Sequence, residues 1–307
     1  MGTLYLVATP IGNLEDITLR ALRVLKEATL IAAEDTRTAR KLLTHFEIAT
    51  PVTAYFARGI GQGNPAATPK VDAILGALER GDVAVISEAG MPGLSDPGYE
   101  LVRAALAREF RVVPIPGANA LTAALVASGL PTDQFVYLGF LPRQKSARRK
   151  FLQSVADEPR TLIAYEAPHR VRESLDDIAA ALGDRAICVA RELTKMYEEF
   201  FRGSVNAARE HFSAHAPRGE FTLVIAGATA ANSEQSTVNS EQWSDARIVS
   251  AVRELMAAGV TRTDAAKRVA RESGRERRAV YKLAMTNRES RIADCESRPV
   301  SDNRDLF

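Results

Sequence analysis

The sequence predicts an α/β protein in which two α/β domains precede a small helical domain. Short apolar segments alternate with amphipathic helical segments over residues 3–128, and this alternation is typical of a parallel sheet with helical crossovers. A second series of apolar segments begins at Gln134. Residues 228–242, rich in Ser, Thr, Asn and Gln, have the composition of a flexible linker and precede three basic helical stretches.

The first domain contains five short apolar runs that predict strands, each of four to six residues. These runs lie at 3–8, 30–33, 52–55, 83–86 and 111–115. Apolar residues recur at helical spacing between them, which predicts the crossovers. The first predicted helix begins at about Thr18, and two more span 38–46 and 69–80. A fourth follows Gly98, and the last ends at Ser128.

The loop after the strand at 83–86 is long for a connection of its kind. It runs from Glu88 to Gly98 and contains three Gly, two Pro and the acids Glu88 and Asp96. Turns between a strand and a helix usually need about 2–6 residues. The carboxyl ends of parallel strands are where open α/β sheets bind ligands, so this loop predicts a ligand site. An ordinary turn is the alternative.

Two further turns at strand ends contain small residues, at 9–13 and 116–120. Small residues allow a ligand to approach the backbone closely. For the second turn, a simple helix start with Asn119 as its N-cap explains the same residues.

The second domain is predicted to hold a mixed sheet. Its strands are expected at 135–140, 161–165, 186–190, 197–203 and 220–226. The segment 143–150 carries five positive charges, which suit phosphate groups, although a solvated helix face is the alternative. The RNA-contact candidates in this segment are Arg143, Lys145, Arg148 and Arg149.

Basic charge is concentrated near the C-terminus. Residues 244–291 contain 12 Lys and Arg against 6 Asp and Glu, although the whole chain has a net charge of only +2. Helices predicted at 244–258, 262–273 and 275–287, with glycine between them, suggest a helix-turn-helix-like unit that contacts nucleic acid. A packed bundle that happens to be basic is the alternative. The candidates here are Lys267, Arg268, Arg271, Arg275, Arg277 and Arg278.

The remaining composition excludes several classes of protein. No apolar run approaches the ~20 residues of a membrane helix, and the N-terminal residues lack the pattern of a secretory signal. Two distant Cys and four scattered His predict neither a disulfide framework nor a metal site. We therefore expect a reduced, cytoplasmic protein without a membrane partner. The expected boundaries are 1–117 and 118–228 for the α/β domains, 229–243 for the linker, 244–290 for the basic domain and 291–307 for a disordered tail.

Several motifs resemble one family when they are taken together and in order. They are T-L-Y-L-V-A-T-P-I-G-N-L-E-D-I-T at 3–18, A-A-E-D-T-R at 32–37, S-E-A-G-M-P-G-L-S-D-P-G at 87–98, S-G-L-P-T-D at 128–133, G-F-L-P at 139–142 and R-E-L-T-K at 191–195. This set is similar to the tetrapyrrole-methylase superfamily and, within it, to the ribosomal RNA small subunit methyltransferase I branch. The resemblance covers residues 3–227, and the basic helices resemble the helix-turn-helix domain appended in that branch.

The resemblance implies a class III methyltransferase fold that binds S-adenosylmethionine between two α/β domains. It also implies a homodimer that methylates the ribose 2′-hydroxyl of a cytidine in the decoding centre of 16S rRNA. The expected partner is this rRNA within the assembled small subunit. By motif position, the cofactor contacts are expected at Pro10, Gly90, Met91, Pro92, Leu94, Asn119, Ala120, Tyr165, Glu220 and Thr222.

Some positions depart from the pattern of that branch. Glu88 and Met91 stand where Asp and Thr are usual, Ala118 and Asn119 alter a proline-glycine turn, and a polar run expected after Val52 is absent. These departures keep two alternatives open. One is a methylase of a tetrapyrrole or another small acceptor, and the other is an RNA-binding ribosome factor whose methylase site has decayed.

Methyl transfer requires in-line placement of the acceptor oxygen, so positioning is expected to supply most of the rate acceleration. A ribose hydroxyl is a weak acid, and a base or a cation near its oxygen would assist the reaction. The candidates at predicted strand ends are Glu88, Glu166, Glu192 and Lys195. Structural ion pairs are the alternative role for each of them.

Overall fold

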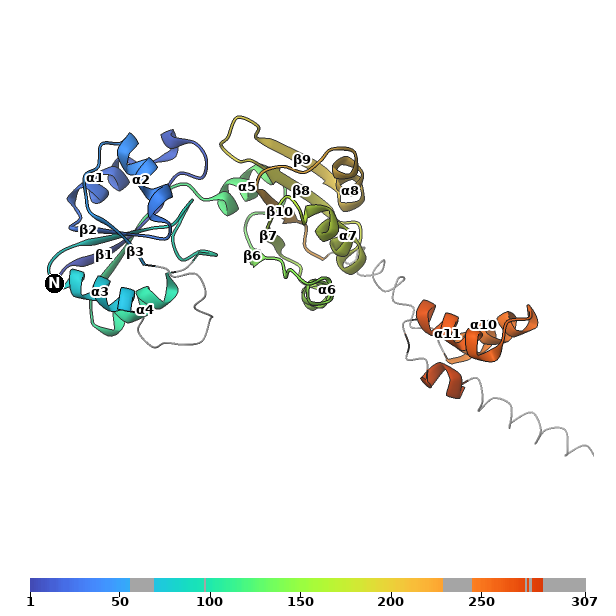
Figure 1. Ribbon diagram of the computed structural model, residues 1–307. Coiled ribbons are helices and arrows are strands. Elements are labelled where there is room, and N and C mark those ends of the chain that lie inside the picture. The colour runs from blue at the N-terminus through green and yellow to red at the C-terminus, as the bar shows by residue number, and fades with distance from the viewer. Residues whose placement is uncertain (56–68, 97, 229–244, 274, 276–277, 284–307) are drawn as a thin grey trace, which may run out of the picture. The chain divides into compact units, whose positions relative to one another are not determined.

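The computed structural model describes residues 1–55, 69–96, 98–228, 245–273, 275 and 278–283 (Figure 1). The chain divides into two compact units, Met1–Ser233 and Glu234–Phe307. The first unit contains both predicted α/β sheets, and the second is helical. The expected linker and tail lie outside the described residues, so the boundaries given for them stay predictions.

The first sheet contains five strands, all parallel to their neighbours. Their order across the sheet is β3-β2-β4-β1-β5. The strands span Thr3–Val7 (β1), Leu30–Ala33 (β2), Val52–Ala54 (β3), Val83–Ile86 (β4) and Arg111–Ile115 (β5). Each lies within a residue or so of its predicted position, because the central strands are buried on both faces and read as continuous apolar runs.

Four helices cover the two faces of this sheet (Figure 1). On one face, α1 (Leu19–Glu27) and α2 (Thr36–His45) bury a core that includes Leu25 and Leu43. On the other, α3 (Pro69–Leu78) and α4 (Tyr99–Ala107) bury Leu75 and Leu101. Helices on both faces confirm the parallel α/β class that the alternation predicted.

The strand order creates a crevice between β1 and β4. After β1 the chain crosses on the α1 face to β2, whereas after β4 it crosses on the α4 face to β5. The loops after β1 and β4 therefore diverge to opposite faces. An open sheet of this kind binds ligands at such a point, beyond the carboxyl ends of its strands.

The second sheet is mixed, as expected, with the order β6-β7-β10-β8-β9. β6 and β7 are parallel, and the other neighbouring pairs are antiparallel. The strands span Phe135–Phe140 (β6), Thr161–Glu166 (β7), Ala186–Arg191 (β8), Glu199–Ser204 (β9) and Phe221–Ile225 (β10).

Helices also cover both faces of the second sheet. α6 (Lys145–Ser154), α7 (Val171–Leu182) and α8 (Val205–Ala214) bury one face around Leu175 and Phe212. The opposite face is covered by α5 (Ala120–Ser128), which follows β5 of the first sheet and packs Leu121 and Leu125 on the second (Figure 1). α5 thus ties the end of the first sheet to the face of the second.

The C-terminal unit has its own small core. α10 (Asp245–Ala257) and α11 (Arg262–Ser273) pack together, and residues 278–283 form a further helical stretch. Ile248, Val252, Val269 and Val280 are buried among them. Across the described residues, every helix is too short or too polar to cross a membrane.

Candidate active site

A cleft of about 390 Å³ opens at the carboxyl edge of the first sheet. Its walls come from the loop after β1, the end of β4 with its loop, and α2, and two residues of the second sheet's loops complete it. We call this space the cleft. Its lining residues are Thr9, Pro10, Ile11, Gly12, Leu14, Thr38, Ala39, Lys41, Leu42, Ile86, Ser87, Glu88, Ala89, Lys195 and Glu220. It lies where the diverging loops after β1 and β4 predict a ligand.

Two loops of the cleft are held together by a short ladder. The backbone N–H of Thr9 donates to the Gly90 carbonyl at 2.9 Å, and the Gly90 N–H donates to the Thr9 carbonyl at 3.1 Å. Gly90 has φ +81°, a conformation that side chains disfavour. This isolated antiparallel bridge lies just beyond β1 and β4 and ties their two loops together at the floor of the cleft.

Three carboxylates gather near this floor. The backbone N–H of Glu88 donates to Glu34 Oε2 at 3.3 Å, and the Ser87 side chain hydrogen-bonds Asp96. Burial and the nearby charge of Glu34 raise the pKa of Asp96 to about 6, with Glu88 adding to the shift and Ser87 opposing it. Burial, Glu34 and Asp96 also raise the pKa of Tyr55. Negative charge at this floor favours a cation or hydroxyl donors.

Lys195 reaches the cleft from the loop after β8. Its Nζ lies 2.9 Å from Glu192 Oε1 and 2.9 Å from Glu220 Oε2, and its stem packs over Gly12, where a Cβ would lie 2.4 Å from Lys195 Cγ. Gly219 makes room for Glu192 in the same way, because a Cβ there would lie 2.3 Å from the Glu192 carboxyl carbon. The ammonium is therefore held in one place rather than mobile.

The ion pairs fix the charges of this group. Burial alone would lower the pKa of Lys195, but its bonds to Glu192 and Glu220 outweigh burial and raise it. Burial alone would raise the pKa of Glu192, but Lys195 and the Glu220 N–H outweigh it and lower the pKa. At neutral pH Lys195 is a cation, so it can orient or stabilise negative charge but cannot act as a base.

A second polar neighbourhood joins the loop 90–96 to the other sheet, and we call it the tyrosine side. The hydroxyls of Ser95 and Tyr137 are hydrogen-bonded, and the rings of Tyr137 and Tyr165 meet edge to face at 5.3 Å. The Tyr165 hydroxyl accepts from the Leu121 N–H at 3.1 Å, next to Asn119, which caps α5. Thus the loop, the α5 N-terminus and β7 are brought together.

The predicted cofactor residues divide between these two places. Pro10 and Glu220 line the cleft. The others belong to the loop after β4, the α5 N-terminus, β7 or β10, where Thr222 pairs with Tyr165. These others are Gly90, Met91, Pro92, Leu94, Asn119, Ala120, Tyr165 and Thr222. The Thr9–Gly90 ladder connects the two places, but their roles toward a ligand stay predictions.

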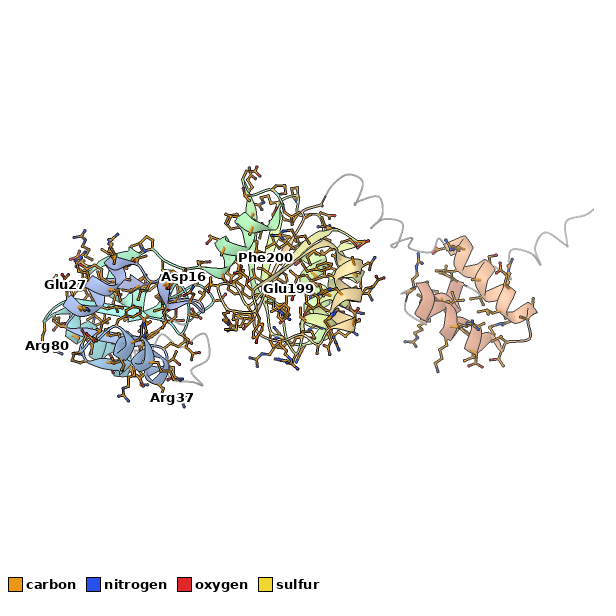
Figure 2. The ribbon with its side chains drawn as sticks, turned by 90° about the horizontal axis from the view of Figure 1, so that it is seen from above. Asp16, Glu27, Arg37, Arg80, Glu199 and Phe200 are labelled. Carbon is orange, nitrogen blue, oxygen red and sulfur yellow. The ribbon has the colours of Figure 1, made fainter. Side chains whose placement is uncertain are left out.

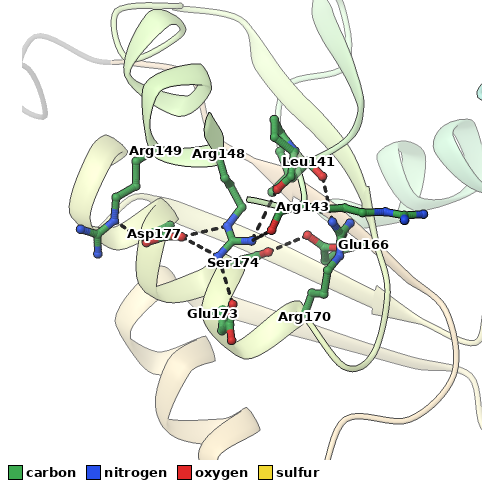
Figure 3. Close-up of polar contacts among 10 residues, drawn as sticks. Leu141, Arg143, Arg148, Arg149, Glu166, Arg170, Glu173, Ser174 and Asp177 are labelled. Atoms are coloured by element: carbon green, nitrogen blue, oxygen red, sulfur yellow. Dashed lines mark hydrogen bonds and ion pairs between the residues drawn. The ribbon is translucent and has the colours of Figure 1, made fainter. Parts of the chain in front are cut away.

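Glu166 was a catalytic candidate, but its contacts give it a structural role (Figure 3). Its side chain is fully buried, forms an ion pair with Arg170, accepts from Ser174 Oγ at 2.6 Å and accepts from the Ala167 N–H at 2.8 Å. With both carboxylate oxygens occupied, Glu166 is not available to a substrate. Glu88, Glu192 and Lys195 are the candidates that lie at or beside the cleft.

Arg148 corrects a second expectation. The sequence predicted an RNA contact, but the side chain is fully buried and pairs with Asp177 at 2.7 Å, between α6 and α7 (Figure 3). The helical period turns this position inward while its neighbours face solvent. Arg143, Lys145 and Arg149 are exposed, although Arg149 Nε is bound to Asp177 at 2.6 Å.

The basic candidates of the C-terminal unit are partly described. Lys267, Arg268 and Arg278 are exposed, and Arg275 pairs with Asp245 at 2.6 Å. Arg271 lies in α11, and Arg277 lies outside the described residues. These surfaces stay candidates for nucleic acid.

Sequence reasoning missed several residues of the cleft and its floor. Glu34 and Thr9 belong to motifs that were recognised, yet nothing local indicated that Thr9 lines the cleft or that Glu34 accepts from the Glu88 N–H. Asp96 shares the long loop with Glu88, and that shared loop was the one available signal. Lys41 looks like any solvated lysine of an amphipathic helix. Among the described residues, no three His, Cys, Asp or Glu side chains are placed to hold a metal ion.

The comparison with known folds agrees with this architecture. The family model for tetrapyrrole (corrin/porphyrin) methylases matches residues 3–208. The crystal structure of the methyltransferase CobJ superposes with a TM-score of 0.54 at 18% identity, covering 74% of this chain and 95% of that one. Cobalt precorrin-4 methyltransferase gives 0.52 at 16%, covering 73% and 94%. The fold is that of the class III methyltransferases.

Curated relatives resemble the chain over nearly its whole length. Proteins from Halalkalibacterium halodurans and Synechocystis are each 46% identical to it, over 92% and 93% of this chain and 94% and 98% of theirs. A Bacillus subtilis protein is 41% identical over 92% and 93%. All three are named ribosomal RNA small subunit methyltransferase I. The chain belongs to the tetrapyrrole methylase family, in the branch that carries this name.

Proposed function

We propose that this protein is an S-adenosylmethionine-dependent methyltransferase of small-subunit ribosomal RNA, acting on the ribose 2′-hydroxyl of a decoding-centre cytidine in 16S rRNA. The observation that carries the proposal is the 46% identity to relatives of that name across 92% of the chain, C-terminal basic residues included. Action within the assembled small subunit, as a cytoplasmic homodimer, completes the proposal.

The residues around the cleft suit the cofactor. S-adenosylmethionine carries a positive sulfonium, which is favoured near the carboxylates of Glu88, Asp96 and Glu34. Gly90 keeps the ladder to Thr9 free of a side chain, with the nearest atom to a Cβ there being Ile11 Cγ2 at 3.4 Å. Asn119 and Tyr165 offer polar groups to a nucleoside from the tyrosine side. These properties support Gly90, Asn119 and Tyr165 as contacts of S-adenosylmethionine.

The bound cofactor would supply an electrophilic methyl group, and the chain's own residues would orient the acceptor. Glu88 lies at the cleft surface, where its carboxylate can accept a hydrogen bond from a ribose hydroxyl. The charged Lys195, fixed by Glu192 and Glu220, can stabilise developing negative charge on the acceptor oxygen. Because the loops are rigidly tied, positioning is expected to dominate the acceleration.

The test is to map ribose methylation in 16S rRNA from a strain that lacks this protein. We expect one cytidine of the decoding centre to lose its 2′-O-methyl group and to regain it when the gene is restored. An unchanged methylation pattern would remove the rRNA proposal.

A decayed RNA-binding factor is the second candidate, favoured by Glu88 and Met91 in the loop after β4. Titration calorimetry with S-adenosylmethionine separates the two. A functional methylase should show saturable binding with one site per chain, whereas a decayed site should show no saturable heat.

A further inference from the structure

We propose that the exposed face of α2, formed by Arg37, Arg40 and Lys41, is a phosphate-binding rim that holds the RNA backbone beside the cleft. This inference rests on the proposed function, because it takes ribosomal RNA as the substrate. It assigns a surface in the first α/β domain, apart from the basic segments that the sequence indicated.

The helical period places these three cations together. Positions 37, 40 and 41 are spaced by three and four residues and therefore share one face of α2. The opposite face is anchored in the core by Ala39 and Leu43, which are 5% and 3% exposed. The cationic face consequently cannot turn inward.

The same helix forms a wall of the cleft. Thr38, Ala39, Lys41 and Leu42 line it, so Lys41 stands where the cationic face meets the cleft. A phosphate bound on this face would lie within a nucleotide's reach of the cleft's interior. The carboxylates at the floor would repel that phosphate, whereas they suit ribose hydroxyls. The charge distribution thus sets an orientation, with the backbone on the rim and the sugar inward.

Charge on the rim is available to a ligand. α2 contains no acidic residue, and within the described part of the chain neither Arg40 nor Lys41 forms an ion pair. Arg37 is bound to Asp35 at 2.7 Å but is 80% exposed, and that pair holds its guanidinium at the start of the helix. Exposed cations without partners lose little when they contact phosphate, since no protein ion pair must first break.

A matched pair of cations lies at the other edge of the same sheet. Lys26, in the last turn of α1, and Arg80, after α3, are both exposed and near the amino ends of the strands. In Figure 2 the labelled Arg37 and Arg80 lie well apart on the first unit. Changing Lys26 and Arg80 alters the net charge equally without touching the rim.

The experiment uses two double variants of the full chain. The rim variant carries Arg40→Gln and Lys41→Gln, and the control variant carries Lys26→Gln and Arg80→Gln. Binding to small ribosomal subunits from a strain lacking the protein is measured over a series of salt concentrations. Each phosphate contact contributes roughly 0.7–0.9 to the slope of log affinity against log salt. The rim variant should therefore lose about 1.5 from the slope and bind on the order of tenfold more weakly at low salt.

The control variant should match the unaltered protein in both quantities and in its affinity for S-adenosylmethionine by calorimetry. Because Lys41 also lines the cleft, subunit binding of all three proteins is compared in the absence of cofactor. If the rim variant equals the control in affinity and slope, the inference is overturned while the proposed function stands. If the unaltered protein binds no small subunits, both fail. Glutamine substitutions at these exposed positions are expected to change the free energy of unfolding by no more than about 0.5 kcal/mol.

Discussion

At the residue scale, Arg148 was predicted to contact RNA but instead forms a buried ion pair with Asp177. Both side chains are fully buried, and Arg148 also donates to the carbonyls of Pro142 and Arg143. A buried charge is tolerated only when it is paired and hydrogen-bonded. The pair therefore joins α6 to α7 and contributes to the stability of the folded protein.

We predict that Arg148→Met lowers the free energy of unfolding by about 3–5 kcal/mol, because it leaves Asp177 charged and buried with only the half-exposed Arg149 as partner. Urea unfolding followed by circular dichroism measures the loss. The matched control is Arg149→Met, which removes the exposed partner and should cost clearly less. Equal losses for the two variants would contradict a special role for the buried guanidinium.

Asp96 gives a prediction about pH. Its pKa, about 6 in the folded protein, lies above its ordinary value of 3.8. The folded state therefore binds the proton more tightly, so the group favours folding below pH 3.8 and costs stability as pH rises through 6. We predict that Asp96→Asn stabilises the protein by roughly 1–2 kcal/mol at pH 8, less than the full shift because water reaches part of the side chain.

The advantage of Asp96→Asn should shrink as pH falls from 7 toward 4, because the carboxyl of the unaltered protein becomes neutral over that range. Thermal unfolding of both proteins at several pH values measures it. An advantage that is constant with pH would show that Asp96 is already neutral or well solvated in the folded state.

At the element scale, the loop from Glu192 to Lys195 carries the one cation that reaches the cleft from the second sheet among the described residues. Glu192 and Thr194 both have positive φ, +51° and +67°. For a β-branched residue such as Thr194 this conformation is strained. The strain is balanced by the Thr194 N–H donating to Glu198 at 2.7 Å and by the ion pairs of Lys195.

We predict that Thr194→Gly raises the stability of the protein by about 1 kcal/mol while slowing methyl transfer, because it relieves the strain but frees the loop that holds Lys195. Unfolding curves and single-turnover rates on small subunits provide the two measurements. A variant that is less stable than the unaltered protein would show that Thr194 is not strained in this loop.

The N-terminus of α5 belongs to the same scale, because this helix ties the two sheets together. The Asn119 side chain accepts from the N–H groups of Leu121 and Thr122 at 2.9 and 3.3 Å. We predict that Asn119→Ala costs about 1 kcal/mol of stability through loss of this cap, whereas Asn119→Asp retains it. If both variants also lose affinity for S-adenosylmethionine, Asn119 is a cofactor contact as well as a cap; calorimetry distinguishes these roles.

At the scale of the whole molecule, the chain consists of an α/β unit that contains the cleft and a helical unit with its own core. Each buries its apolar residues within itself, so removal of one leaves the core of the other intact. The helical unit adds positive charge, and its described cations Lys267, Arg268 and Arg278 are exposed. A separate basic unit can add phosphate contacts without altering the cleft.

We predict that deletion of everything after Ala231 leaves the affinity for S-adenosylmethionine unchanged and weakens binding to small ribosomal subunits. Fewer phosphate contacts mean fewer released counterions, so the salt dependence of the truncated chain should be shallower. Calorimetry and binding over a salt series measure the two effects. Identical slopes for full and truncated chains would instead indicate a structural role for the basic helices.

The sequence by itself determined the class of fold and the positions of most strands, because hydrophobic periodicity is a local property that survives without tertiary contacts. It also predicted a ligand site at the loop from Glu88 to Gly98, since the unusual length and the glycines are visible in the chain, and that role stays a prediction. No helix was predicted at α7 or α8, although their buried residues recur at helical spacing.

Only the tertiary structure decided which charged residues meet. Glu166 and Lys195 look alike in sequence as charges at strand ends, yet one is enclosed by Arg170 and Ser174 and the other reaches the cleft. The difference follows from strand order and from the packing of neighbouring helices, which bring together residues that are far apart in the chain. Local patterns carry no record of such pairings, so charge at a strand end predicts a neighbourhood but not a role.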